Sequence, residues 1–207
     1  MKSIIDISVE LSEDTLVYPG DPRPEFEQYR TIEKDSYSLL RLRITTHTST
    51  HMDAPKHVLL NGTDVTGVPL ERLIGRARVL KFEKSTHITK ADLEKYSPAQ
   101  DEIILLKTGE INYLKSGIFR KEYIALTKEA AEYLVKCGIK AVGIDGLSIE
   151  PYDGDLTVHK ILLSAGIPIF EVLDLESVGE GIYSFIGLPL KIRNGDGAPA
   201  RVILTEE

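Results

Sequence analysis

The chain has 207 residues, 42% of them hydrophobic, and its 25 Lys and Arg against 32 Asp and Glu give a formal net charge of −7. This acidic surplus argues against a nucleic acid partner, because phosphate backbones are bound by clustered Lys and Arg. No apolar run approaches the roughly 20 residues of a membrane span, and Asp6 comes too early for a signal peptide, so we expect neither a membrane partner nor secretion. The single cysteine, Cys137, excludes an internal disulfide and fits a reducing compartment, which makes the cytoplasm the expected location.

In chain order, the first half predicts short extended segments separated by turns. Alternating polar and apolar residues predict a strand at residues 3–9, and two prolines with a glycine predict a loop at 18–22. The other elements expected there are an extended stretch at 37–46, a turn at 61–64, one helical turn at 70–74, a strand at 77–82, and a short helix from the Thr89 cap through Tyr96.

The second half alternates strands and helices. Thr127 caps a predicted helix at residues 128–136, which Gly138 ends. The other expected elements are strands at 103–106, 141–144, 168–173, 183–192 and 200–204, and a helix at 158–164. We therefore predict one α/β domain, residues 1–207, with a mixed sheet and no internal repeat.

Three of the five histidines, His47, His51 and His57, fall within eleven residues. The hydroxyl and β-branched residues around His47 favour an extended chain, in which positions 47, 49, 51 and 53 point to the same side. His47, His51 and Asp53 would then share one face, and such a donor set suits Zn²⁺, or Mn²⁺ or Fe²⁺ in an expanded geometry. The alternative is a polar strand edge with hydrogen-bonded histidines, but burying so many polar groups without a ligand is costly.

Pro55 should end this strand, because proline has no backbone N–H to donate, and His57 would then lie in a loop beyond the metal-facing residues. A histidine beside a metal but not bound to it can exchange a proton near neutral pH. We therefore assign His57 as the general acid/base.

Two downstream residues are further metal-ligand candidates. Glu171 interrupts an apolar strand, where a carboxylate must be paired, metal-bound or solvated, and His159 lies at the start of a predicted helix. Spacing alone leaves both open. Asp145 either forms a turn before Gly146 or orients a loop or a ligand. The remaining chemically notable residues are given structural interpretations: His87 as a surface residue, Cys137 as a packing residue, and 195–197 as a turn.

The segment from His47 to His57 resembles the His-x-Gly-Thr-His-x-Asp-x-Pro-x-His signature of the cyclase family, which includes bacterial kynurenine formamidases and isatin hydrolases. The similarity extends over nearly the whole chain, and its further points are Thr108-Gly109, Gly143-Ile144-Asp145 with Ser148, His159, Glu171 and the ending 195–201.

This resemblance implies a swivelling β/β/α fold, assembly into dimers or larger oligomers, and a site for two metal ions, zinc or manganese. Carried onto the matching positions, it implies that His47, His51 and Asp53 hold one metal and that His159 holds the second. Asp53 and Glu171 would bridge the two ions, and His57 would be the acid/base.

The chain departs from the family pattern at two positions. Ser49 stands where the signature has glycine, which predicts a narrower cavity between the metal-facing histidines. Tyr18 stands before Pro19-Gly20-Asp21, where kynurenine formamidases have a substrate-contacting tryptophan. Tyrosine can still stack on an aromatic ring, so Tyr18 is the predicted substrate-binding residue.

Together these features predict a metal-dependent hydrolase of an amide-type bond in a small molecule. N-formyl-L-kynurenine, from tryptophan catabolism, is the first expected substrate, which makes the chain an arylformamidase, and a cyclic amide such as isatin is the second. A lyase or cyclase that stabilises an enolate is a third chemistry. The alternative from another class is a non-catalytic metal-binding module, which would have no use for a free histidine beyond Pro55.

Overall fold

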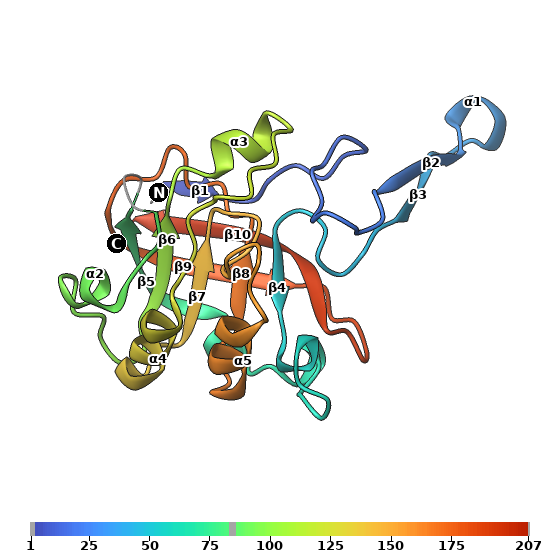
Figure 1. The fold of residues 1–207 in the computed structure, drawn as a ribbon. Coiled ribbons are helices and arrows are strands. Elements are labelled where there is room, and N and C mark those ends of the chain that lie inside the picture. Colours follow the sequence, from blue (N-terminus) through green and yellow to red (C-terminus); the bar gives the residue numbers. More distant parts are fainter. Residues whose placement is uncertain (1–2, 83–85, 207) are drawn as a thin grey trace.

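The computed structural model describes residues 3–82 and 86–206. Its main sheet contains eight strands: β1 (Ile4–Asp6), β4 (His51–Asp53), β5 (Ile74–Lys81), β6 (Ile103–Lys107), β7 (Ala141–Ile144), β8 (Ile169–Glu171), β9 (Gly181–Pro189) and β10 (Gly197–Glu206). The order across the sheet is β1-β10-β4-β8-β7-β6-β5-β9. Because β10 also pairs with β9, seven strands close into a barrel, and β1 pairs with β10 outside that ring (Figure 1).

The strands β5, β6, β7 and β8 run parallel to one another, and helices connect them. These helices are α2 (Lys90–Glu94), α4 (Lys128–Cys137) and α5 (Thr157–Ser164), and they lie on one side of the barrel (Figure 1). A parallel pair requires such a crossover, which explains the alternation of strand and helix signals in the second half of the sequence. Thr127 accepts a hydrogen bond from the Ala130 N–H at the start of α4, and Gly138 ends it with a φ of 71°.

Two apolar cores lie on opposite faces of the parallel strands. Ile104 and Leu106 of β6 pack in the cluster under α4 and α5, whereas Ile103 and Leu105 pack inside the barrel with Phe170 and other residues. Successive side chains of a strand point to opposite faces, so a strand buried on both faces is apolar throughout. The expected α/β fold with a mixed sheet is confirmed.

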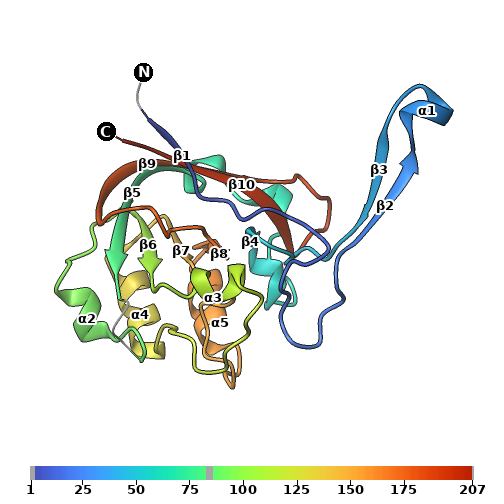
Figure 2. The same ribbon diagram turned by 90° about the horizontal axis from the view of Figure 1, so that it is seen from above.

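A two-stranded arm projects from the barrel (Figures 1 and 2). It consists of β2 (Glu25–Arg30) and β3 (Leu39–Arg43), joined through the single turn of α1 (Ile32–Asp35). The arm leaves the body after the loop that contains Tyr18 and returns to it just before His47. It therefore lies between two segments of the predicted site.

Three further short elements and one connecting helix complete the chain. The 3₁₀ turns η1 (Pro55–His57), η2 (Val65–Gly67) and η3 (Leu70–Arg72) follow β4, and α3 (Ile111–Lys115) follows β6. Among the described residues, no helix is long and apolar enough to cross a membrane.

The sequence interpretation missed β2, α1 and α3, and it was wrong about residues 47–50. This segment was expected to continue β4 but forms a turn and bend. The Thr48 hydroxyl accepts a hydrogen bond from the Thr45 N–H at 3.0 Å, a local bond that competes with strand pairing. Ser49 has a φ of 61°, in the left-handed region that favours glycine, which gives a physical reason for the glycine of the family signature.

Candidate metal centre

Asp53 is the centre of the histidine cluster and is fully buried at the end of β4. Its Oδ1 lies 2.8 Å from His47 Nδ1 and 3.3 Å from His51 Nε2. His47 therefore reaches the same carboxylate as His51, although it does so from a turn and not from the expected strand. The three residues each offer one ligand atom, and these atoms all lie within 4.8 Å of one another.

The cross-strand register brings Glu171 to this cluster. Glu171 of β8 pairs directly with His51 of β4, and its Oε2 lies 3.5 Å from His51 Nε2. His159, in the first turns of α5, places its Nε2 3.3 Å from Glu171 Oε1 and 3.7 Å from Asp53 Oδ2. The structure thus joins both downstream candidates to the histidine-rich segment, at the edge where α5 and β8 meet β4.

His57 lies in η1, directly after Pro55, and the expectation that β4 ends before this proline is confirmed. The ring centroid of His57 is 4.1 Å from that of His47 and 5.7 Å from that of His159. His57 also belongs to two further potential donor groups, one with Asp53 and His159 and one with His47 and Asp196. Burial lowers the pKa of His57, and the neighbouring imidazoles add to this effect against the pull of Asp53, so the ring is neutral at pH 7 and can accept a proton.

The charges of the cluster are strongly coupled. Burial opposes charge on His51, but Asp53 and Glu171 outweigh it and raise the pKa of His51 to about 10. The same balance, with Glu150 and Glu171 as partners, raises the pKa of His159 to about 10. Burial and the nearby Asp53 charge would raise the pKa of Glu171, yet His159 and His51 lower it to about 2. The cluster is therefore a buried anionic site that attracts a cation, either protons or a metal.

The potential ligand atoms of the cluster are not all satisfied by hydrogen bonds to one another, and a metal would satisfy them. His51 Nε2 and Asp53 Oδ2 are both buried without a hydrogen-bond partner among the described residues. Buried polar atoms are almost always paired, and a missing ion is one of the few explanations for an exception. Imidazole nitrogens and carboxylate oxygens are also the ligands that zinc and manganese take in proteins. The residues present therefore fit a divalent metal.

A cavity of about 280 Å³ opens beside this cluster. His47, His51, His57, His159 and Glu171 line it, whereas Asp53 lies buried behind them. Its other lining residues are Tyr18, Asp21, Leu147, Ser148, Glu150, Pro151, Tyr152, Gly154 and Leu156. Every residue predicted for the site except Asp53 therefore borders one cavity.

Tyr18 forms part of an aromatic wall of this cavity. Its ring stacks on that of Tyr152 with centroids 5.9 Å apart, and Phe119 packs edge-on against Tyr152 at 5.3 Å. Ser49 does not narrow the cavity as the sequence suggested, because its hydroxyl donates to the Val9 carbonyl at 3.1 Å and it is absent from the cavity lining. The left-handed backbone at Ser49 turns this side chain away from the histidines.

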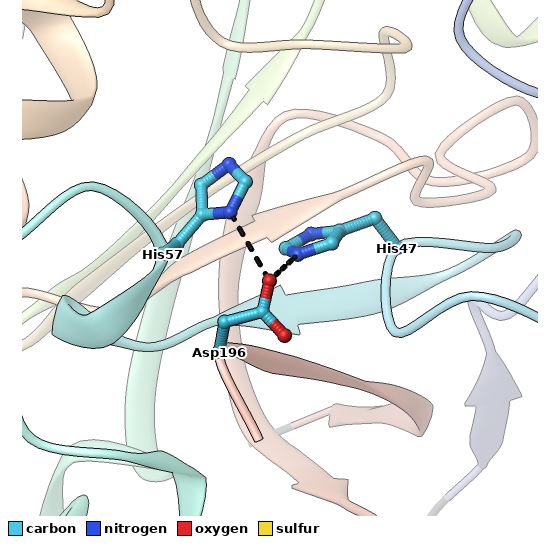
Figure 3. A group of neighbouring side chains, drawn as sticks. All are labelled: His47, His57 and Asp196. Atoms are coloured by element: carbon cyan, nitrogen blue, oxygen red, sulfur yellow. Dashed lines mark hydrogen bonds and ion pairs between the residues drawn. The ribbon is translucent and has the colours of Figure 1, made fainter. Parts of the chain in front are cut away.

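The sequence interpretation missed two carboxylates that contact the cluster. Glu150 is buried, and its Oε2 lies 2.9 Å from His159 Nδ1. Asp196 was assigned to a simple turn, but its Oδ2 lies 2.9 Å from His47 Nε2 and 3.6 Å from His57 Nδ1 (Figure 3). A metal-binding histidine usually donates its second N–H to a carboxylate or carbonyl oxygen. The need for such acceptors is the one sequence signal that makes Glu150 and Asp196 candidates.

The residues outside the cluster agree with their predicted roles. Asp145 accepts hydrogen bonds from the N–H groups of Thr108 and Gly109, both at 2.8 Å, and so orients the loop after β6. His87 is exposed, and the free thiol of Cys137 packs against the helix-side core.

Comparison with known proteins gives matches along the whole chain. The profile of the family described as "Putative cyclase" matches residues 5–151. The kynurenine formamidase of Salinibacter ruber is 34% identical, with 99% of this chain and 98% of that protein covered. The kynurenine formamidase of Bacillus thuringiensis subsp. konkukian is 33% identical, with 97% and 96% covered.

Solved structures agree with these matches. A structure described as a potential metal-dependent hydrolase with cyclase activity superposes with a TM-score of 0.89 at 32% identity, covering 100% of this chain and 99% of that one. Isatin hydrolase A from Labrenzia aggregata superposes with a TM-score of 0.86 at 22% identity, covering 98% of this chain and 93% of that one. The second likeness concerns the fold alone.

Proposed function

The chain belongs to the cyclase family, and from this premise we propose that it is a metal-dependent hydrolase of an amide-type bond, an arylformamidase that acts on N-formyl-L-kynurenine. The observation that carries the proposal is the buried cluster around Asp53, in which two ligand atoms have no hydrogen-bond partner among residues 3–82 and 86–206, beside a cavity lined by histidines and tyrosines. The full-length similarity to two kynurenine formamidases supports this substrate over others.

We propose that the cluster holds two divalent ions, zinc or alternatively manganese. His47, His51 and Asp53 would hold one ion, and His159 the other, with Asp53 and Glu171 shared between them. The short distances from both carboxylates to several imidazoles support this division, because each carboxylate has two oxygens and faces histidines on either side. When bound, divalent ions supply Lewis acidity that activates water and polarises a carbonyl.

His57 is the proposed acid/base. It borders the cavity, and burial holds it neutral, so it can take a proton from water and deliver it to the leaving nitrogen. In the overall hydrolysis the formyl carbon gains the hydroxyl of water, the C–N bond breaks, and the nitrogen gains a proton. The products are formate and a free aromatic amine.

Tyr18 is the proposed substrate-binding residue. Stacked on Tyr152, it offers an aromatic surface that can contact the aryl ring of the substrate. The cavity volume of about 280 Å³ is at the lower end of ligand pockets, which matches a compact aromatic substrate. A cyclic amide such as isatin has a similar ring, and it is the second candidate.

Assembly, domain extent and location complete the proposal. We propose a homodimer or larger homo-oligomer, because the arm exposes Leu39, Leu40 and Leu42, and a two-stranded hairpin is only marginally stable without a packing partner. We also propose a single domain spanning residues 1–207, because strands from both ends of the chain, β1 and β10, pair with each other. A cytoplasmic location is supported by the free thiol of Cys137.

Reconstitution of the metal-stripped protein with zinc or manganese tests the proposed reaction. The protein would be assayed on N-formyl-L-kynurenine and isatin, with identification of the products. Formate release that requires added metal supports the proposal. Full activity without metal would overturn metal dependence, and isatin opening without formamide hydrolysis would favour the second substrate.

A further inference from the structure

In each of the three proposed histidine ligands, His47, His51 and His159, one ring nitrogen faces the carboxylates Asp53 or Glu171 and the other contacts a fixed acceptor. His51 Nδ1 lies 2.8 Å from the Ser49 carbonyl oxygen, and His159 Nδ1 lies 2.9 Å from Glu150 Oε2. In both rings Nε2 then faces the centre of the site. A ring nitrogen that donates to an acceptor keeps its proton, which leaves the lone pair of the other nitrogen for a metal.

His47 reverses this arrangement. Its Nε2 lies 2.9 Å from Asp196 Oδ2, and its Nδ1 faces Asp53 Oδ1 at 2.8 Å. The acceptor that fixes this ring is therefore a side chain from a different part of the sheet, immediately before β10. Figure 3 shows the same oxygen of Asp196 lying between the rings of His47 and His57.

The Asp196 carboxylate is itself held in place. Thr46 donates its hydroxyl to Asp196 Oδ1 at 2.9 Å, and the Asp196 carbonyl accepts the Ala54 N–H at 2.9 Å. The next residue, Gly197, pairs with Asp53 across the strands, and a Cβ atom there would lie only 2.7 Å from His47 Cε1. The backbone of Gly197 thus packs against one side of the His47 ring, and Asp196 holds its Nε2 atom.

We propose that Asp196 is a positioning residue that holds His47 with Nε2 protonated, so that His47 binds metal through Nδ1, whereas His51 and His159 bind through Nε2. This inference rests on the proposed metal site and adds the residue that selects the ligating nitrogen of His47. Asp196 acts through His47 and need not contact the metal or the substrate.

Zinc affinity tests this role. The dissociation constant for Zn²⁺, measured by competition with a chelator, is compared for the wild type, Asp196→Ala and Asp196→Asn. Loss of such an outer partner weakens metal binding by about 10–100-fold, which we expect for Asp196→Ala. The Asn variant should recover most of the affinity, because its amide oxygen can still accept the Nε2 proton.

A matched control separates positioning of His47 from anchoring of the loop. Asp64 Oδ2 accepts the Asn194 N–H at 2.7 Å and so holds the same loop two residues away, and its other side-chain hydrogen bonds within the described chain are to Thr66 and Gly67. We expect Asp64→Ala to bind zinc like the wild type. Equal weakening in Asp64→Ala and Asp196→Ala would show that only the loop matters and would overturn the inference.

The protonated nitrogen gives a readout that does not depend on activity. Long-range ¹H–¹⁵N spectra of the zinc-loaded protein, with the His47 signals assigned by comparison with His47→Gln, should show a proton on Nε2 in the wild type and in Asp196→Asn. If His47 of the wild type binds zinc through Nε2, or if Asp196→Ala keeps the wild-type zinc affinity, the role of Asp196 is overturned while the proposed metal site stands. Failure of the wild-type protein to bind zinc would overturn the proposed metal site as well.

Discussion

The proton-transfer role assigned to His57 can be separated from metal binding, because His57 lies in η1 and the proposed ligands lie in other segments. We expect His57→Ala to lower kcat by about 10²–10⁴-fold, the usual contribution of general acid/base catalysis, with metal content unchanged. Turnover and metal content per chain would be measured on the same samples. His87→Ala is the matched control, since His87 is exposed and outside the cluster.

Loss of bound metal in His57→Ala would contradict this assignment and would make His57 a ligand, as its grouping with Asp53 and His159 permits. Unchanged turnover would remove it from the mechanism.

Asp145 provides a test of buried charge outside the metal cluster. Burial raises the pKa of Asp145 from 3.8 to about 6, and the donors on Thr108 and Gly109 only partly oppose it. A carboxyl whose pKa is higher in the folded state binds its proton more tightly there, so its contribution to stability is fully present below pH 4 and is lost as the pH rises through 6. Replacement by asparagine removes this ionisation.

We therefore expect the stability of Asp145→Asn relative to the wild type to improve by up to about 3 kcal/mol between pH 4 and pH 7. Urea unfolding of the metal-free wild type and of metal-free Asp145→Asn at each pH would give the difference between their free energies of unfolding. The titration of the groups that both proteins share does not contribute to this difference. A trend in the opposite direction would mean that the hydrogen bonds from Thr108 and Gly109 outweigh burial.

At the residue level, the sequence was informative where one segment carries the chemistry. His51 and Asp53 could be placed together because they are two apart on β4, and Pro55 located His57. Asp196 and Glu150 could not be identified this way, because their roles depend on the register of β10 with β4 and on the position of α5.

At the scale of elements, the arm formed by β2 and β3 projects from the barrel, and contacts within a single chain do not account for its stability. Phe26 pairs with Leu42, and Gln28 with Leu40, on one face of the hairpin, while Glu25 with Arg43 and Glu27 with Arg41 form ion pairs on the other. Exposed ion pairs contribute little to stability. The apolar face therefore needs a partner, for which we propose a second copy of the chain.

We expect the double variant Leu40→Glu and Leu42→Glu to shift the protein toward monomers while the barrel stays folded. Light scattering after size exclusion would give the mass in solution, and circular dichroism would report the fold. Arg41→Ser, on the opposite face of the same strand, is the control and should keep the wild-type mass. A wild-type protein that is monomeric at all concentrations would refute the role of the arm.

Elements with local signals were predicted well, and elements defined by tertiary pairing were not. Thr127 and Gly138 mark both ends of α4 through their own hydrogen bonding and backbone angle. The strand β2 is mostly polar, with the sequence Glu-Phe-Glu-Gln-Tyr-Arg, and its alternation of polar and apolar residues breaks at Gln28, so its pattern does not indicate a strand. The turn at 47–50 follows from hydroxyl hydrogen bonds that a count of β-branched residues does not reveal.

At the scale of the whole molecule, the proposed metal ligands come from positions 47 to 171 and meet only when the barrel closes. The sequence predicts alternating strands and helices in a mixed sheet, but the pairing of β4 with β10 and β8, and of β5 with β9, joins distant segments without a local signal. The site is therefore a product of the complete fold. An unfolded chain cannot offer the same ligands together.

This coupling predicts how metal removal changes stability. A metal that binds only the folded state stabilises it by about 2.7 kcal/mol when its concentration is 100 times Kd, which corresponds to roughly 5–10 °C in Tm for a chain of this size. We expect chelation to lower Tm by this order, measured by calorimetry with and without added zinc. The protein should nevertheless stay folded at 25 °C, because both apolar cores are complete without the ion.

The size of this change distinguishes the two classes of function proposed for the site. A non-catalytic module that uses metal to hold its fold together would unfold on chelation, as structural zinc domains do. A hydrolase with an independent core would lose activity and regain it when zinc is restored, with its circular dichroism spectrum unchanged throughout. Unfolding at 25 °C after chelation would therefore count against the enzyme, whereas reversible loss of activity in a folded protein would support it.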